Sequence, residues 1–282
     1  MIVNPCFTGT KEKCKVPAGG TAGQVLEKRS GADHDVQWGN IPSIYATVAS
    51  NAGAHNSLFR GKYLGSAVTA AQYATIAAGT FDDLFIGDYW TINGINWRIA
   101  AFDYYLGTGS PALTTHHVTI VPDTKLDTQS MNDTSTTNGG YVGSKMYTTN
   151  LATARSKINT AFSGHVLTHK FTLSDGVENG KVTHSVIVDQ DVVLMNERNV
   201  YGQTIMSSEC NDGSADPQWR TFDRTQFALF ALAPEFIQKT IYYWLRDVVS
   251  TVFFATVSQG GESSRNTAGS NDDVRPAFSI KG

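Results

Sequence analysis

Histidine pairs are the first residues of this chain whose spacing could do chemistry, because two imidazoles on one face can share a metal ion. His165 and His169 are four positions apart, which would place both rings on one side of a helix or on one face of a strand. Gly164 is expected to end a helix just before the pair, and no glutamate follows His165 as the zinc-protease pattern requires. His116 and His117 would point to opposite faces of a strand. We predict no metal site; a metal shared by His165 and His169 is the alternative.

The motifs of nucleophilic and nucleotide-dependent enzymes do not occur in the sequence. We find no Gly-X-Ser-X-Gly elbow, no Walker loop and no Gly-X-Gly-X-X-Gly turn. The chain has 25 acidic residues, so pairs of carboxylates arise by chance and indicate no acid–base site. We therefore predict a protein that binds and is not an enzyme, with no catalytic residues and no cofactor.

Cysteine usage indicates a reducing compartment. The three cysteines, Cys6, Cys14 and Cys210, are too few for a disulfide framework. Free thiols are expected, with a Cys6–Cys14 bridge as the alternative. The first ten residues have neither the basic nor the apolar region of an export signal, so we expect synthesis in the cytoplasm.

Composition favours a β-rich protein whose partner is neither nucleic acid nor a membrane. Charged residues make up 17% of the 282 residues, while Gly, Ser, Thr and Asn are abundant. The formal net charge of −3 carries no strong sign that would attract nucleic acid or anionic lipid. No apolar run approaches the roughly 20 residues that span a bilayer.

The C-terminal stretch alternates between apolar and polar segments. Two framework phrases, Trp244-Leu245-Arg246-Asp247 and Val274-Arg275-Pro276-Ala277-Phe278, enclose it. Phe253–Val257 is expected to be a buried strand, and 258–267 a long polar loop that follows it. A rigid strand that carries a polar loop is how scaffolds present binding surfaces. We therefore predict a recognition site in this stretch.

Local signals predict the elements that must position this surface. Thr69-Ala70-Ala71-Gln72 is a capping box that should begin a helix ending at Gly79, and apolar residues at helical spacing predict a second helix over 147–162. Asn93-Gly94 between alternating runs predicts a hairpin. Further strands are expected at 117–121, 171–173, 182–187, 191–195, 227–230, 242–246 and 277–280, and polar loops at 123–140 and 207–216. Two helices with many short antiparallel strands make an α+β fold.

The first forty residues differ in composition from the rest. A Gly-rich phrase at 17–26 is followed by a short alternating strand that ends at Trp38. One interpretation is a flexible leader, because so few apolar residues cannot close a core. The other is that the phrase resembles the short trimeric connectors of phage tail fibres. We divide the chain into a small β-rich connector at 1–40, a linker at 41–58 and a ligand-binding domain at 59–282.

The order of several phrases carries a second resemblance. They are Gly87-Asp88-Tyr89-Trp90-Thr91-Ile92-Asn93-Gly94, Trp97-Arg98-Ile99-Ala100, Leu194-Met195-Asn196-Glu197, Leu232-Ala233-Pro234-Glu235-Phe236, Tyr243-Trp244-Leu245-Arg246-Asp247 and Val274-Arg275-Pro276-Ala277-Phe278. Together they resemble the C-terminal domain of gut-bacterial phage tail proteins, which is similar to the C-type-lectin-fold variable proteins diversified by retroelements. The resemblance covers roughly 59–282. It implies two helices and twisted antiparallel sheets, with a ligand face built from the final segment.

The resemblance also implies which positions in the final segment hold the fold and which contact a ligand. The framework positions are Trp244, Arg246, Arg275 and Phe278. Ligand contacts are expected at Thr251, Phe253, Ser258, Gln259, Glu262, Ser264, Arg265, Asn266, Asn271 and Asp272. The two arginines are expected to hydrogen-bond loop carbonyls or a carboxylate, with direct binding of an anion as the alternative. Tyrosine, a frequent contact residue in such faces, is absent after Tyr243.

Calcium is the metal that this resemblance brings into question. Sugar-binding C-type lectins hold it with Glu-Pro-Asn or Gln-Pro-Asp followed by Trp-Asn-Asp, and neither phrase occurs here. The nearest pieces are Met131-Asn132-Asp133 and Asn271-Asp272-Asp273. Calcium needs several converging oxygen ligands, so we interpret the second piece as a solvated turn and predict no calcium site.

The two resemblances together imply a receptor-binding protein at the tip of a phage tail fibre. Its expected partners are a bacterial surface protein or glycan, two further copies of itself in a homotrimer, and other tail proteins through the N-terminus. Its expected location is the virion, after synthesis in the host cytoplasm. The alternatives are a ligand-binding protein of the same fold that never enters a virion, and an inert structural tail component.

Overall fold

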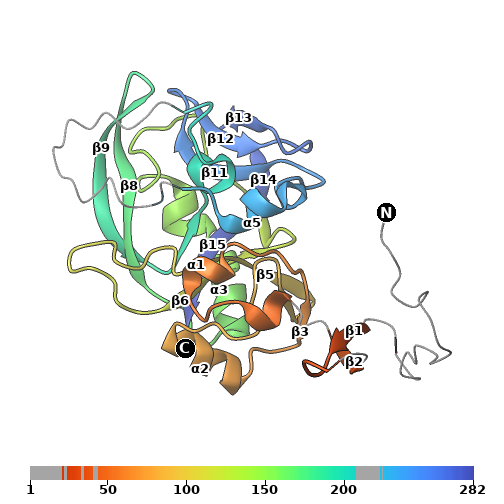
Figure 1. Ribbon diagram of the computed structural model, residues 1–282. Coiled ribbons are helices and arrows are strands. Elements are labelled where there is room, and N and C mark those ends of the chain that lie inside the picture. The colour runs from red at the N-terminus through yellow and green to blue at the C-terminus, as the bar shows by residue number, and fades with distance from the viewer. Residues whose placement is uncertain (1–20, 22–23, 33–34, 41–43, 208–222, 224) are drawn as a thin grey trace. The chain divides into compact units, whose positions relative to one another are not determined.

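The computed structural model describes residues 21, 24–32, 35–40, 44–207, 223 and 225–282. The three cysteines, most of the Gly-rich phrase at 17–26 and nearly all of the loop expected at 207–216 lie outside these residues. The chain divides into two compact units, 1–48 and 49–282 (Figure 1). We describe each unit by itself.

The first unit contains an antiparallel hairpin. β1 (Gln24–Lys28) pairs with β2 (Val36–Asn40) in a register that sets Leu26 opposite Trp38. The strand expected before Trp38 is therefore present. Leu26 leaves 41% of its surface exposed, and a two-stranded hairpin is at best marginally stable in water. A 3-10 helix, Ile44–Thr47, follows.

The second unit is built on two sheets and a separate hairpin. The larger sheet has the order β10-β15-β6-β5-β4-β3. Its strands are, in that order, Val192–Leu194, Pro276–Lys281, His117–Pro122, Ile95–Phe102, Tyr89–Ile92 and Tyr63–Gly65. The smaller sheet has the order β13-β12-β11-β14-β7, with strands Ser263–Thr267, Phe253–Val257, Tyr243–Val248, Asn271–Val274 and Asp127–Ser130. β8 (His169–Glu178) and β9 (Lys181–Gln190) form the long hairpin (Figure 1).

These elements give an α+β fold, as predicted, but the sheets are mixed. β3 pairs in parallel with β4, and β11 pairs in parallel with β14, where only antiparallel pairing was expected. Parallel neighbours need a long crossover between them. The crossover from β11 to β14 consists of β12 and β13, which are the predicted recognition segment.

Both predicted helices are present. α2 (Ala70–Ala78) begins with the Thr69 capping box and ends at Gly79 in the left-handed region, at φ 69°. The second begins as a π-helix, Met146–Asn150, and continues as α3 (Ala152–Ala161). The Asn93-Gly94 hairpin is also present, with both residues at positive φ. Each of these signals acts through contacts a few residues apart, so local sequence suffices to specify it.

Three short helices were not predicted: α1 (Ala52–His55), α4 (Glu197–Tyr201) and α5 (Ala228–Leu232). The expected strand at 227–230 is wrong, because Ala228, Leu229 and Leu232 are good helix formers and the run folds as α5. α1 lies within the expected linker at 41–58, and its buried His55 stacks on Phe85 with ring centroids 4.7 Å apart. The second unit thus begins before residue 59.

Two further predictions near the C-terminus are wrong. The expected loop at 258–267 is a loop only as far as Glu262, because 263–267 pairs with β12 as the edge strand β13. The expected solvated turn at 271–273 is strand β14, paired with β7, and both aspartates in it are buried. Polar side chains concealed these strands, since strand pairing satisfies backbone groups regardless of side-chain polarity.

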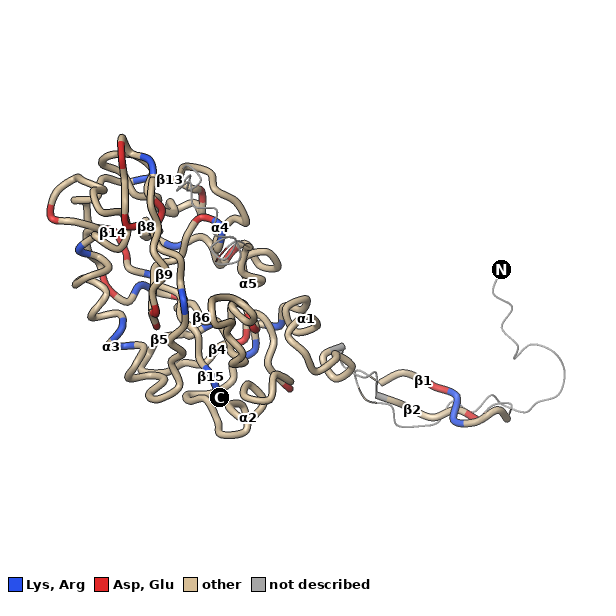
Figure 2. Tube along the Cα trace, turned by 90° about the vertical axis from the view of Figure 1, so that its left-hand side faces the viewer, with Lys and Arg blue, Asp and Glu red and all other residues tan. Residues whose placement is uncertain are grey.

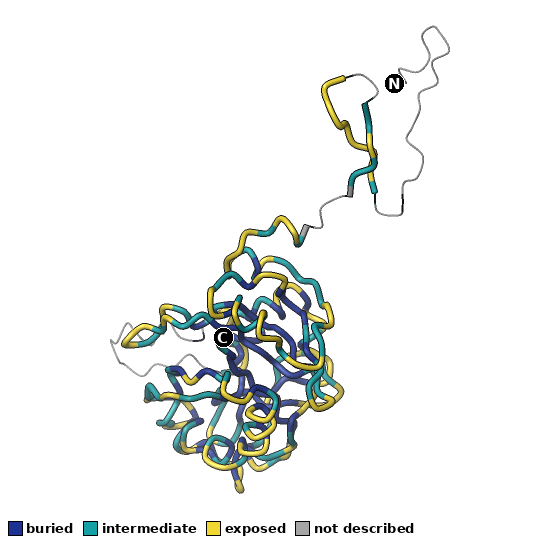
Figure 3. The backbone as a smooth tube through the Cα atoms, turned by 90° about the horizontal axis from the view of Figure 1, so that it is seen from below, coloured by how far each residue is buried: buried dark blue, intermediate teal, exposed yellow. Residues whose placement is uncertain are grey.

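The core of the second unit brings together residues that are far apart in the sequence. Trp97 from β5 packs edge-on against Phe162 at the end of α3 and Phe278 in β15, at centroid distances of 5.4 and 5.6 Å. Figure 3 shows buried residues through the interior of this unit and exposed ones at its turns. Lys/Arg and Asp/Glu are interspersed along it (Figure 2). Within the part of the chain described, no helix is long and apolar enough to cross a membrane.

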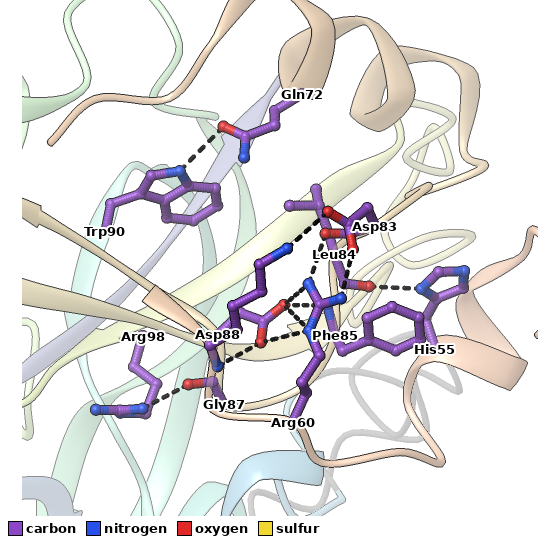
Figure 4. Close-up of polar contacts among 11 residues, drawn as sticks. His55, Arg60, Gln72, Asp83, Leu84, Phe85, Gly87, Asp88, Trp90 and Arg98 are labelled. Carbon is purple, nitrogen blue, oxygen red and sulfur yellow. Dashed lines mark hydrogen bonds and ion pairs between the residues drawn. The ribbon is translucent and has the colours of Figure 1, made fainter. Parts of the chain in front are cut away.

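A buried carboxylate organises the chain entering β4. Asp88 is fully buried and accepts hydrogen bonds from the Arg60 guanidinium and from the backbone N–H groups of Lys62 and Phe85, at 2.8–2.9 Å for the backbone donors (Figure 4). So many donors compensate the loss of water around the charge. The same close-up shows Arg98 donating to the Gly87 carbonyl oxygen, and the Arg98 guanidinium also holds Asp123.

Candidate functional site

The predicted recognition segment folds as a hairpin at the edge of the smaller sheet. β12 pairs with β13 so that Ala255 lies opposite Arg265. β12 is buried except at Phe253, whereas β13 is half-buried or exposed throughout. Arg265 places its guanidinium 5.2 Å from the centroid of the Phe253 ring. The hairpin therefore pairs an apolar inner strand with a polar outer strand that a partner can reach.

The ten predicted contact residues divide by exposure. Thr251, Gln259, Glu262, Arg265 and Asn271 are exposed, and Phe253, Ser264 and Asn266 are half-buried. Ser258 and Asp272 are buried, with 6% and 9% of their surfaces exposed, which leaves little surface for a partner. Ser258 Oγ donates to Glu262 Oε2 at 3.1 Å, and Asp272 Oδ2 accepts from Asn266 Nδ2 at 2.9 Å. These two residues hold the turn and the return strand in place.

Glu197 anchors this hairpin from behind, and sequence reasoning missed it. Its fully buried carboxylate accepts from Ser263 Oγ in β13 at 2.6 Å and from Ser207 Oγ at 2.6 Å. The N–H groups of Ile205 and Met206 donate to the same carboxylate at 3.0 and 2.8 Å. Burial opposes ionisation, but the hydrogen bonds from the serines and backbone outweigh it and lower the pKa of Glu197. The phrase Leu194–Glu197 contained the residue, but nothing in it indicated a contact with β13.

The framework residues Trp244 and Phe278 are buried as expected. Trp244 is fully buried, and its Nε1 donates to the Gln129 carbonyl oxygen in β7 at 2.8 Å. That bond ties β11 to β7 across β14, which lies between them. Trp244 therefore holds the smaller sheet together at the strand from which the recognition hairpin departs.

Arg246 has hydrogen-bond or ion-pair partners for both of its terminal nitrogens. Its Nη1 donates to the Leu194 carbonyl oxygen at 2.6 Å, and its Nη2 forms an ion pair with Asp223. The Asp223 carboxylate also accepts from Tyr105 Oη at 2.7 Å and Asn199 Nδ2 at 3.1 Å. The arginine thus ties β11 to β10 and to Asp223, which agrees with the expectation that it bonds a loop carbonyl and a carboxylate.

Arg275 is also buried, with 1% of its surface exposed, but its partners are fewer. Its Nε donates to the Pro122 carbonyl oxygen at 2.9 Å. The guanidinium lies 5.1 Å from the Tyr243 ring centroid and 5.5 Å from that of Phe230. Neither Nη1 nor Nη2 meets hydrogen-bond geometry with an acceptor among the described residues, while the neighbouring Tyr243 hydroxyl favours the charged form of Arg275. Buried donors left unpaired cost about 1–3 kcal/mol, more when charged, and burial lowers the pKa of Arg275.

A cavity of about 730 Å³ opens beside Arg275. Three segments form it: the residues after β6, the connection from α5 to β11, and the recognition hairpin with β14. Its lining residues are Asp123, Thr124, Lys125, Glu235, Gln238, Lys239, Thr240, Ile241, Tyr243, Gln259, Asp273 and Arg275. Only Gln259 among them is a predicted contact residue. The others come from loops far apart in the chain, and no sequence pattern indicated that they meet.

His165 and His169, the pair that could have shared a metal, lie in separate packing environments. His165 stacks on Tyr73 at 3.5 Å between ring centroids, and His169 lies 4.1 Å from the Tyr105 ring. Burial and, to a smaller extent, the nearby His117 lower the pKa of His169 to about 4, so this ring is neutral near pH 7. In the described ranges, no group of three or more His, Cys, Asp or Glu residues is placed to hold a metal ion.

Comparisons with protein families, with curated proteins and with solved structures return no match for this chain. Its function must therefore be argued from the hairpin, the cavity and the phrases in its sequence.

Proposed function

We propose that this chain is a receptor-binding protein of a phage tail fibre, which recognises a bacterial surface ligand through its C-terminal segment. The observation that carries the proposal is the β12–β13 hairpin, whose polar outer strand is half-buried or exposed while its inner strand is buried beyond Phe253. Exposed side chains on a rigid support can vary without loss of the fold. That combination suits a protein that must adapt to changing receptors.

The support behind the hairpin favours binding with little rearrangement. Glu197 holds β13 through Ser263, and Tyr201 Oη donates to the Gly261 carbonyl oxygen in the turn at 2.9 Å. A loop that is already ordered loses less conformational entropy when it binds. We therefore assign the recognition surface to the exposed predicted residues, which are Thr251, Gln259, Glu262, Arg265 and Asn271.

We further propose that the second unit has a C-type-lectin-like fold. The features that support this are two longer helices, α2 of nine and α3 of ten residues, two sheets, and a final segment that leaves the smaller sheet and returns to it. The six phrases quoted above give the same assignment. A virion location, and recognition of a protein or glycan on the host, follow from the proposal that the chain is a receptor-binding protein of a tail fibre.

The N-terminal unit is proposed to assemble the fibre tip as a homotrimer. Its hairpin leaves apolar Val25 and Leu26 exposed, which a second and third copy could cover. Three linked sites would raise weak contacts to strong attachment. Light scattering of the whole chain should give three copies, and removal of residues 1–40 should give a folded monomer. A monomeric whole chain at micromolar concentration would contradict the trimer.

The recognition surface can be tested with a triple variant of Gln259→Ala, Arg265→Ala and Asn271→Ala. These side chains are exposed, and none forms a hydrogen bond within the described residues. Each change should cost within about 0.5 kcal/mol of stability. Labelled protein would be tested for adhesion to a panel of gut-bacterial isolates. The parent should bind some isolates and the triple variant none.

The matched control changes Ser156, Asn159 and Ser163 to alanine, which are exposed on α3 and just after it. This variant should bind as the parent does. Adhesion that survives in the triple variant would remove the assignment of the surface. Binding to no isolate by the parent would instead favour an inert structural component.

A further inference from the structure

Arg275, whose terminal nitrogens are buried, lines a cavity that is large enough for a small ligand. Its two terminal nitrogens are buried without a hydrogen-bond partner among the described residues, and the arginine lines the cavity. Buried polar groups in folded proteins are nearly always paired, so an unpaired charged pair of donors calls for a missing partner. Its volume of about 730 Å³ falls within the range of small-molecule sites.

The carboxylates around the cavity cannot easily supply that partner, because two of the three are already engaged. Asp123 is held by Arg98, with Nε 2.8 Å from Oδ1. Asp273 forms an ion pair with Lys125 at 3.1 Å and accepts from Thr128 Oγ1 at 3.0 Å. The third, Glu235, is exposed. The Tyr243 hydroxyl donates to the Ile237 carbonyl oxygen at 3.1 Å.

Lys239 is a second cation in the cavity without a partner. It is half-buried and makes no hydrogen bond or ion pair within the described ranges. Burial and the nearby charge of Arg275 lower the pKa of Lys239 to about 7. An anion placed between the two cations would relieve that repulsion, as opposite charges do at close range.

We propose that this cavity binds the carboxylate of a sugar-sized polar acid, with Arg275 and Lys239 as the residues that hold the charged group. A guanidinium offers two parallel N–H donors that match the planar carboxylate. A phosphate dianion fits less well, because Asp123, Glu235 and Asp273 also line the cavity and repel a second negative charge. Gln238, Thr240 and Gln259 add neutral groups that can hydrogen-bond hydroxyls.

This assignment is independent of the proposed function. A carboxylate site in the cavity would exist whether or not the chain attaches to bacteria, and the adhesion test above changes only one residue that lines it. Because Gln259 belongs to both the cavity and the recognition surface, an acidic saccharide on a cell surface is one natural source of such a group.

The test is titration calorimetry of the whole chain with D-glucuronate, D-glucose and glucose 6-phosphate. Glucose differs from glucuronate only at C6, where a hydroxymethyl group replaces the carboxylate. Glucose 6-phosphate tests whether the cavity prefers a phosphate. Charge-assisted hydrogen bonds should make glucuronate bind about tenfold more tightly than glucose. Equal binding of glucuronate and glucose, or no binding of glucuronate at millimolar concentration, would overturn the proposal. Tighter binding of glucose 6-phosphate than of glucuronate would overturn the choice of carboxylate.

Three variants place the carboxylate in the cavity. Arg275→Lys keeps the charge but loses the paired donors, so the affinity for glucuronate should fall about tenfold. Lys239→Gln should weaken binding roughly threefold, and Glu235→Gln should strengthen it roughly twofold by removing a repelling charge.

Lys181→Gln, on the exposed β8–β9 hairpin, is the control and should leave the affinity unchanged. If Arg275→Lys does not fold, Lys239→Gln and Glu235→Gln still test the site on intact protein. Unchanged glucuronate affinity in these two variants would contradict the assignment.

Discussion

The regions around Arg246 and Arg275 use the same residue type in different ways. Both arginines belong to apolar phrases and both side chains are buried. Arg246 is surrounded by acceptors, with a carbonyl oxygen and the Asp223 carboxylate in place. Arg275 has one acceptor, two aromatic rings and an adjoining cavity.

The difference teaches that burial alone does not identify a framework residue. A buried arginine whose terminal nitrogens are both paired holds the structure together, as at Arg246. A buried arginine whose terminal nitrogens lack acceptors, beside a cavity, either destabilises the fold or binds a ligand. Four predictions test this comparison.

The largest effect should come from removing Trp244, which supports both regions through β11. Trp244→Ala should cost about 3–5 kcal/mol, because a fully buried indole leaves a large cavity. Urea unfolding followed by circular dichroism measures the loss. Tyr242→Ala is the control. The Tyr242 side chain is exposed, so its removal should cost less than about 1 kcal/mol. Equal losses would show that Trp244 is not the support that we infer.

A smaller loss should follow Glu197→Gln, which tests how much a buried charge with several hydrogen-bond partners stabilises the fold. The amide keeps the shape but loses the charge that five donors among the described residues share, which should cost about 1–3 kcal/mol. Because the pKa of Glu197 is lowered, its contribution is present above the unfolded-state pKa and is lost as pH falls through the folded-state value. Unfolding at pH 7 and at pH 3 should therefore differ less in the variant. Glu262→Gln, at an exposed carboxylate, is the control; a variant that matches the parent at both pH values contradicts the anchor.

Lys239→Met should stabilise the protein, whereas the changes at Trp244 and Glu197 should destabilise it. The folded-state pKa of Lys239 is lowered to about 7 by burial and by Arg275 and Arg98, against the attraction of Asp123. The charged lysine therefore penalises the fold fully below pH 7, and the penalty fades as pH rises toward the unfolded value near 10.5. We expect a gain of about 1 kcal/mol or more at pH 6 and a smaller gain at pH 9. Lys181→Met should show no such gain. Destabilisation by Lys239→Met at pH 6 would place the lysine in the framework.

The sequence predicted the parts of the fold that depend on neighbouring residues. The Thr69 capping box and the Asn93-Gly94 turn each rest on bonds within a few positions. β13 was missed because its side chains are polar although it pairs with the neighbouring strand β12, and β14 was missed because its pairing depends on the distant strand β7. The strand expected at 227–230 failed because helical propensity decided that run.

The candidate site was predicted only along the segment that is continuous in sequence. The hairpin and its exposed residues could be expected from the polar stretch after Phe253–Val257. The Glu197 anchor and the cavity could not, because Ser263 and Glu197 are far apart in sequence and the cavity joins three loops. Lys239 in particular lies in a connection without any recognisable motif.

The most direct test of the comparison is the melting temperature of the whole chain and of Arg275→Lys, with and without D-glucuronate. A ligand that binds only the folded state raises the melting temperature. The account predicts that glucuronate raises it for the parent, and that glucose with the parent, or glucuronate with folded Arg275→Lys, gives a clearly smaller rise at the same concentration. The same rise in the variant, or none in the parent, would contradict the claim that Arg275 is left unpaired in order to bind a ligand.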